Sequence, residues 1–240
     1  MDCLIRSLSE PTEIPDWLDH GTPEGVLRWA TETYEDTVSL ACSFGAEDVV
    51  LLDMLARVTD RPRVFVLETG RLHQETYDVM DQCRERYGIE FDVFAPQTSA
   101  LQNLLRQKGA SSFYASVENR HECCDIRKVE PLRRALSDRC AWITGQRRLQ
   151  SVTRVHLPVA EVDHGHGGIL KINPLANWTE DQVWGYIRAN DVPYNKLHDR
   201  GFPSIGCAPC TRAIAPGEDV RAGRWWWELP EQKECGLHAR

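Results

Sequence analysis

The stretch TVSLACSFGAEDVVLLDMLARV (37–58) decides the fold class of this chain. Its first six residues are mostly apolar or β-branched, as expected for a buried strand of a parallel sheet. The next six, SFGAED (43–48), form a turn of small and charged residues, and the remainder is typical of an apolar helix. A turn before a helix is either an anion-binding turn or a simple connection. Strand, turn and helix in succession are the repeating unit of an α/β protein.

The same unit recurs through the first 145 residues. Further strands with their turns are expected at 62–70, 89–96 and 140–145, and further helices at 73–88 and 99–109. We therefore predict a single α/β domain with a mostly parallel, twisted sheet flanked by helices. Ligands of such sheets bind at the carboxyl ends of the strands, so the turns after the strands form the candidate site.

The alternation of strands and helices ends near residue 157. Residues 157–175 have the pattern of two short strands around a turn, and 179–190 that of a helix with Thr179 as its N-cap. Four prolines then punctuate the chain up to residue 216. We expect a loop-rich C-terminal extension of the same domain, which gives a domain at 1–227 and a mobile tail at 228–240.

Composition excludes several classes of protein. The chain has 240 residues, 42% of them hydrophobic, and a net charge of −8. An acidic chain is a poor general nucleic-acid binder, although it can still contain a local basic pocket. The amino terminus has no basic segment followed by an apolar stretch, and the longest apolar runs are too short to span a bilayer. We expect a soluble cytoplasmic protein without a membrane or nucleic-acid partner; the sequence is compatible with a homo-oligomer.

The cysteines form two close pairs. Cys123 and Cys124 are adjacent, and Cys207 and Cys210 form a CxxC pair. Four thiolates in two pairs can hold a structural zinc ion or an iron–sulfur cluster. Zinc sites usually space their ligands by two to four residues, so adjacent cysteines favour a 4Fe–4S cluster. The open alternatives are a redox-active CxxC and two unrelated buried pairs.

Six arginines flank the strand ends and the cysteine motifs, which indicates an anionic ligand because guanidinium groups match phosphate and sulfate oxygens. They are Arg147, Arg148, Arg154, Arg212, Arg221 and Arg224. The chain ends in KECGLHAR (233–240), where Cys235 is followed by His238. A thiolate near cations is a nucleophile. The tail alone is compatible with a catalytic thiol and with an ordinary frayed end.

Seven segments together resemble the sulfonucleotide reductases, the adenylyl-sulfate and phosphoadenylyl-sulfate reductases of assimilatory sulfate reduction. The segments are SFGAEDVVL, ETGRLHQETY, CCDIRKVEPL, TGQRRLQSVTR, NPLANWTEDQVW, GCAPCTRAIAPGEDVRAGRWWW and ECGLH. One departure is ETGR at 68–71, where the family more often has DTG. The resemblance implies an adenine nucleotide α-hydrolase-like fold, and a 4Fe–4S cluster bound by four cysteines. These are Cys123, Cys124, Cys207 and Cys210.

The resemblance also implies the chemistry. Cys235 would attack the sulfate sulfur of adenylyl sulfate, AMP would leave, and thioredoxin or a glutaredoxin-like reductant would release sulfite from the enzyme S-sulfocysteine. Members without the cluster mostly use the 3′-phosphorylated nucleotide. The complete cysteine set therefore indicates the adenylyl-sulfate branch, with a cluster-bearing reductase that accepts the 3′-phosphorylated substrate as the alternative.

The resemblance assigns roles to further residues. The negative sulfate oxygens repel a thiolate, so nearby cations must offset the repulsion and the charge that develops on the leaving phosphate. Arg221, Arg224 and His238 are expected there, with Arg154 as a further candidate. Lys128 would bridge cluster and substrate electrostatically. The residues expected along the nucleotide are Ser43, Phe44, Gly45 and Gly145.

Two other classes compete with this interpretation. An ATP pyrophosphatase that thiolates tRNA would need an SGGxDS-like loop, whereas this chain has SFGAED and is acidic. An iron–sulfur redox sensor would need a partner- or DNA-binding element, and it leaves Cys235 unexplained.

Overall fold

The computed structural model describes residues 14–150 and 154–229. Six strands form one sheet in the order β3-β2-β1-β4-β6-β5, and all neighbours are parallel except the β5–β6 pair. The strands are β1 (Val38–Ala41), β2 (Val64–Leu67), β3 (Asp92–Phe94), β4 (Ala141–Ile143), β5 (Ala160–Asp163) and β6 (Ile169–Ile172). The mostly parallel sheet and the hairpin within 157–175 are therefore confirmed.

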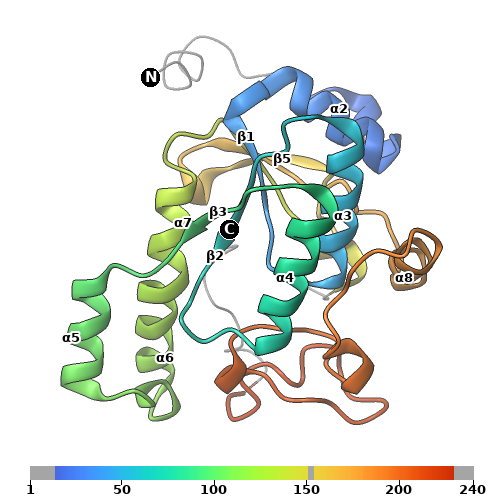
Figure 1. Ribbon diagram of the computed structural model, residues 1–240. Coiled ribbons are helices and arrows are strands. Elements are labelled where there is room, and N and C mark those ends of the chain that lie inside the picture. Colours follow the sequence, from blue (N-terminus) through green and yellow to red (C-terminus); the bar gives the residue numbers. More distant parts are fainter. Residues whose placement is uncertain (1–13, 151–153, 230–240) are drawn as a thin grey trace.

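Helices cover both faces of this sheet (Figure 1). They are α2 (Pro23–Tyr34), α3 (Ala46–Val58), α4 (Gln74–Tyr87), α5 (Thr98–Lys108), α6 (Val117–Cys124), α7 (Glu130–Ala135) and α8 (Glu180–Ala189). The main core packs one sheet face against α2, α3, α4 and α8, and a smaller cluster packs Phe65 and Trp142 of the other face against α7. The predicted N-cap Thr179 is confirmed, and it forms a capping box with Gln182.

A long helical segment carries the first cysteine pair. Helix α6 ends at Cys124, a π-helical turn follows at Asp125–Val129, and α7 continues directly from it. Single π-turns inside helices are frequent at functional sites, because they shift which side chains face a given direction. Local sequence patterns do not predict this helix, because its apolar residues are few.

The segment after α8 is rich in loops, as expected. Between α8 and Leu229 the regular helical structure is limited to two 3₁₀ turns, His198–Arg200 and Ala208–Cys210. A backbone hydrogen bond of 2.8 Å from Ala208 N–H to the Arg71 carbonyl, just after β2, holds this extension to the body of the protein. In Figure 1 the extension gathers at one end of the molecule, near the start of α4. Within the described ranges, no helix has the length and apolar character needed to cross a membrane.

Leu40 provides a test of the core. It lies in the interior strand β1 and is completely buried. We expect Leu40→Ala to lower the free energy of unfolding by about 2–5 kcal/mol, because it removes buried methyl groups and leaves a cavity. The control is Val93→Ala on the edge strand β3, where the side chain is 51% exposed and the expected change is below about 0.5 kcal/mol. Urea denaturation measures both, and equal losses would contradict this packing.

Candidate functional site

A cavity of about 870 Å³ opens where β1, β2 and β4 end. The turn after β1 contributes four of its lining residues, the turn after β4 contributes Gly145 among others, and the C-terminal extension contributes Arg221 and Arg224. The volume suits a nucleotide-sized ligand. Ten residues were expected at the reacting groups or along the nucleotide, and eight of them line this one cavity: Ser43, Phe44, Gly45, Lys128, Gly145, Arg154, Arg221 and Arg224. The other two, Cys235 and His238, lie outside the described residues.

The turn after β1 is closed by a buried carboxylate. The Ser43 backbone N–H and hydroxyl donate to Asp48 at 2.7 and 2.6 Å. Between them, Phe44 is fully buried and adopts a left-handed backbone with φ of 59°, which is uncommon for a residue other than glycine. Because Asp48 already uses both Ser43 donors, these two groups do not point an available hydrogen at an anion. The turn is therefore shaped by Asp48, and Ser43 offers acceptor lone pairs to the cavity.

Asp48 also joins the turn after β1 to the turn after β4. Burial raises the pKa of Asp48 to about 6, while hydrogen bonds from Ser43 and from the Gly145 backbone act in the opposite direction. A Cβ atom on Gly145 would lie 2.3 Å from an Asp48 carboxylate oxygen and 2.9 Å from Glu47 Cβ. Glycine is thus required here by the close approach of α3, and not by an unusual backbone angle.

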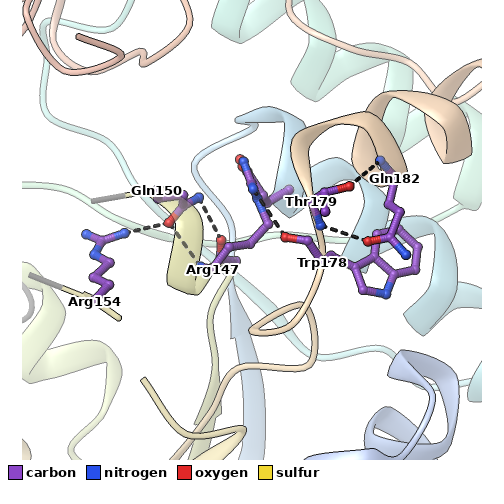
Figure 2. Close-up of polar contacts among 8 residues, drawn as sticks. Arg147, Gln150, Arg154, Trp178, Thr179 and Gln182 are labelled. Atoms are coloured by element: carbon purple, nitrogen blue, oxygen red, sulfur yellow. Dashed lines mark hydrogen bonds and ion pairs between the residues drawn. The ribbon is translucent and has the colours of Figure 1, made fainter. Parts of the chain in front are cut away.

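A second set of contacts orders the wall that follows β4 (Figure 2). Arg147 pairs with Glu47 at 2.7 Å and donates to the Trp178 carbonyl. Gln150 accepts hydrogen bonds from the Arg147 backbone at 3.1 Å and from Arg154 at 2.6 Å, as Figure 2 shows. Gln150 therefore connects Arg154 to the ion pair of Arg147 with the half-buried Glu47.

The six arginines differ in whether they line the cavity and in which groups they contact. Arg154, Arg221 and Arg224 line the cavity. Arg147 lines it too, but its charge is paired with Glu47. Arg148 and Arg212 have structural partners, namely the Leu157 carbonyl at 2.7 Å and Glu218 at 3.1 Å. An arginine run in the sequence thus overstates the positive charge that faces the cavity.

The four cysteines of the two pairs share one buried cluster. Cys123 and Cys124 end α6, and Cys207 and Cys210 flank a 3₁₀ turn of the extension. All four are free thiols and pack with Leu104, Phe113 and Trp225. Among the residues described, no group of three or more histidine, cysteine or carboxylate side chains is arranged to hold a metal ion. The thiols gather in one place without already enclosing a coordination point.

The surroundings of the thiols favour negative charge at one of them. Burial raises the pKa of Cys210 to about 12. For Cys207, burial also acts upward, but the charge of Lys128 and a hydrogen bond with the Thr69 hydroxyl hold the pKa below its usual value. Lys128 also lines the cavity, so it lies between the cavity and the thiols.

The comparison with protein families decides the relationship. Residues 37–213 match the phosphoadenosine phosphosulfate reductase domain family. The chain belongs to this family. It is 56% identical over 203 residues to adenosine 5′-phosphosulfate reductase of Burkholderia cepacia, covering 85% of this chain and 81% of the relative. A protein of the same name from Allochromatium vinosum is 52% identical over 205 residues, with coverages of 85% and 80%.

A solved structure of the same reductase family has the same fold. The crystal structure of phosphoadenylyl-sulfate reductase from Candida auris matches with a TM-score of 0.69 and 30% identity, covering 85% of this chain and 100% of that one. The adenine nucleotide α-hydrolase-like fold expected from the sequence is thereby confirmed.

Several residues of this reductase-family site were missed from the sequence. Asp48 was part of the quoted turn, but its burial and its partners depend on the turn after β4. Thr69 lies in the ETGR segment, and only the fold shows that its hydroxyl meets the Cys207 thiol at 3.4 Å. Glu68, the departure from the family pattern, accepts a hydrogen bond from Gly70 N–H at 2.5 Å and so closes its own turn.

Gly145 allows a test of the close approach. We expect Gly145→Ala to lower the free energy of unfolding by about 1–3 kcal/mol, because the new methyl group overlaps Asp48 and Glu47. Gly185→Ala in α8 is the control, since no atom lies within 4 Å of the added group. Thermal unfolding should show no loss for the control. A neutral Gly145→Ala would contradict the described contact.

The raised pKa of Asp48 predicts a pH dependence. A carboxyl whose folded pKa lies above its unfolded value of 3.8 stabilises the fold at low pH, and this stability is lost as the pH rises through about 6. Relative to Asp48→Asn, the parent protein should lose about 2 kcal/mol of unfolding free energy between pH 4 and pH 7. Denaturant titrations at several pH values measure this difference. Asp181→Asn, an exposed control in α8, should follow the parent curve, and an Asp48→Asn curve parallel to the parent would disprove the prediction.

Proposed function

We propose that this protein reduces adenylyl sulfate to sulfite and AMP in assimilatory sulfate reduction. The observation that carries the proposal is the cationic wall of the cavity beside the buried thiols: Lys128, Arg221 and Arg224 line the same cavity. Two bacterial relatives at 52–56% identity are named for reduction of the same nucleotide. The proposed location is the cytoplasm, where dithiol reductants are kept reduced.

The proposed reaction begins with the Cys235 thiolate. Its sulfur attacks the sulfate sulfur, a sulfur–sulfur bond forms, and the bond from sulfur to the bridging phosphate oxygen breaks. The electron pair leaves with AMP, and Cys235 carries the SO₃ group as an S-sulfocysteine. Arg221 and Arg224 would offset the repulsion between thiolate and sulfate oxygens and stabilise the charge that develops on the phosphate. His238 is proposed to assist at the same group.

The second half of the reaction needs two electrons from a dithiol protein such as thioredoxin or a glutaredoxin-like protein. One of its thiolates attacks the Cys235 sulfur, and sulfite leaves with the electron pair of the broken sulfur–sulfur bond. The second thiolate then resolves the mixed disulfide, which oxidises the dithiol to a disulfide and regenerates Cys235.

The four clustered thiols are proposed to bind a 4Fe–4S cluster. Two buried donors beside them, Trp225 Nε1 and Arg127 Nε, have no hydrogen-bond partner among the described residues. Donors without partners are costly inside a protein, and hydrogen bonds to thiolate or sulfide sulfurs would satisfy them. The residues present therefore fit such a group. When bound, it supplies a compact charge beside Lys128, while the dithiol supplies the electrons.

The nucleotide end of the proposed complex uses the turns that Asp48 joins. Ser43, Phe44 and Gly45 would lie along the nucleotide on one side, and Gly145 on the other. Arg154, held by Gln150, adds a positive group to the cavity lining. The 3′-phosphorylated nucleotide is the alternative substrate, supported by the phosphoadenylyl-sulfate reductase at 30% identity.

A single-turnover experiment tests the proposal. Protein purified without oxygen should form a covalent SO₃ adduct when adenylyl sulfate is added without reductant, and intact-mass spectrometry detects it. Cys235→Ser should form none, whereas Cys83→Ser, a change at a buried core thiol of α4, should keep the reaction. An adduct that persists in Cys235→Ser, or no adduct in the parent protein, would sink the proposal. The 3′-phosphorylated nucleotide in a parallel reaction distinguishes the two substrates.

A further inference from the structure

A buried ion pair joins the first cysteine pair to the end of the described chain. Arg120 donates from Nε and Nη2 to the two carboxylate oxygens of Glu228, at 3.0 and 2.8 Å. The two side chains are 0% and 3% exposed. The two residues are 108 positions apart in the sequence. A two-pronged contact of this kind fixes direction as well as distance.

Arg120 also contacts the thiol cluster. It lies one helical turn before Cys124 in α6, and its guanidinium group hydrogen-bonds the Cys124 sulfur. Its Cζ atom lies 4.8 Å from the centre of the Trp225 ring. Arg224 of the cavity wall contacts the same ring at 4.7 Å. The Arg120 guanidinium group thus contacts Cys124, Trp225 and Glu228.

The backbone between these contacts is held in an unusual form. Trp225 is 1% exposed and has a left-handed φ of 42°, which costs on the order of 1 kcal/mol or more for such a residue. Hydrogen bonds of 3.1 Å from Trp225 N–H to the Cys210 carbonyl and 2.9 Å from Glu228 N–H to the Trp225 carbonyl hold the turn. Residues 225–228, here called the root segment, are therefore held in place by contacts with both cysteine pairs.

The root segment lies close in the sequence to the proposed nucleophile. Glu228 precedes Cys235 by seven residues in the sequence, and an extended chain covers at most about 3.6 Å per residue, or about 25 Å. The position of the root segment thus limits how far from it the thiol can lie. Moving the root segment would lower the effective concentration of the thiol at the bound nucleotide and misalign its attack.

We infer that Arg120 is a positioning residue that ties the root segment of the Cys235-bearing chain end to the four-cysteine cluster. The inference rests on the proposed function of Cys235 and deepens it. It gives two of the four cysteines a mechanical role, because Cys210 accepts a hydrogen bond from Trp225 N–H and Cys124 contacts Arg120, which holds Glu228. Arg120 itself acts through Glu228 and Trp225.

The test removes the link without leaving a buried charge. A single change at either partner would strand the other charge and destabilise the protein, whereas replacing both by apolar residues is often neutral. The test variant is therefore Arg120→Met with Glu228→Leu. The matched control is Glu122→Gln. Glu122 also lies in α6, and its change removes the 2.7 Å ion pair with Lys108 but does not touch the root segment.

Two measurements carry the test. In the test variant, adduct formation from bound adenylyl sulfate should slow about tenfold or more, while the Kd for AMP changes less than twofold. Chymotrypsin cleavage at Trp225–Trp227, followed by mass spectrometry on protein without substrate, should accelerate at least tenfold. The control should match the parent protein in both. Circular dichroism confirms that the variants remain folded.

The outcomes separate the two hypotheses. No adduct in the parent protein overturns the proposed function, but accelerated cleavage in the variant would still support the link between Arg120 and the root segment. Parent-like adduct formation and parent-like cleavage in a folded double variant overturn the positioning role. Loss of adduct formation together with a more than tenfold weaker AMP affinity also overturns it, because the effect would then lie in the nucleotide site.

Discussion

The geometry of the cavity depends on one buried carboxylate. Asp48 accepts hydrogen bonds from the Ser43 backbone and hydroxyl and lies close against Gly145, so it joins the turns after two neighbouring strands, β1 and β4. Burying a carboxylate is costly unless its oxygens accept hydrogen bonds, so Asp48 depends on these donors. The left-handed backbone of Phe44 and the close approach of α3 to Gly145 accompany this contact. The turn after β1 is thus held by Asp48.

Positive side chains form another part of the cavity lining. The protein as a whole has a net charge of −8, yet Lys128, Arg221 and Arg224 line one cavity. Several other arginines near the strand ends are neutralised by carboxylates or used by carbonyl groups. The proposed chemistry needs positive charge in the cavity, because an anionic nucleophile must approach an anionic sulfate group. The buried thiols beside Lys128 place the proposed cluster next to that wall.

The buried pair of Arg120 and Glu228 connects this wall to the end of the chain. Buried ion pairs add little net stability compared with apolar residues of similar size, but they fix geometry. Here the pair fixes the turn that carries Trp225, against which Arg224 packs. The cluster cysteines, the cavity wall and the start of the proposed nucleophile arm are thus one packed unit, in which a change at one member is felt by the others.

The sequence by itself determined the order of elements, the parallel sheet, the hairpin and the Thr179 cap, because apolar runs and capping residues act over a few neighbouring positions. Eight residues that the motifs singled out line one cavity. The helix around Cys124 with its π-turn, the pairing of Arg147 with Glu47, and the Asp48 contacts were decided only by the tertiary structure. The same holds for Arg120 and Glu228. These contacts join residues that lie far apart in the chain, or they depend on burial, and local sequence patterns carry no information about which distant group will be the partner.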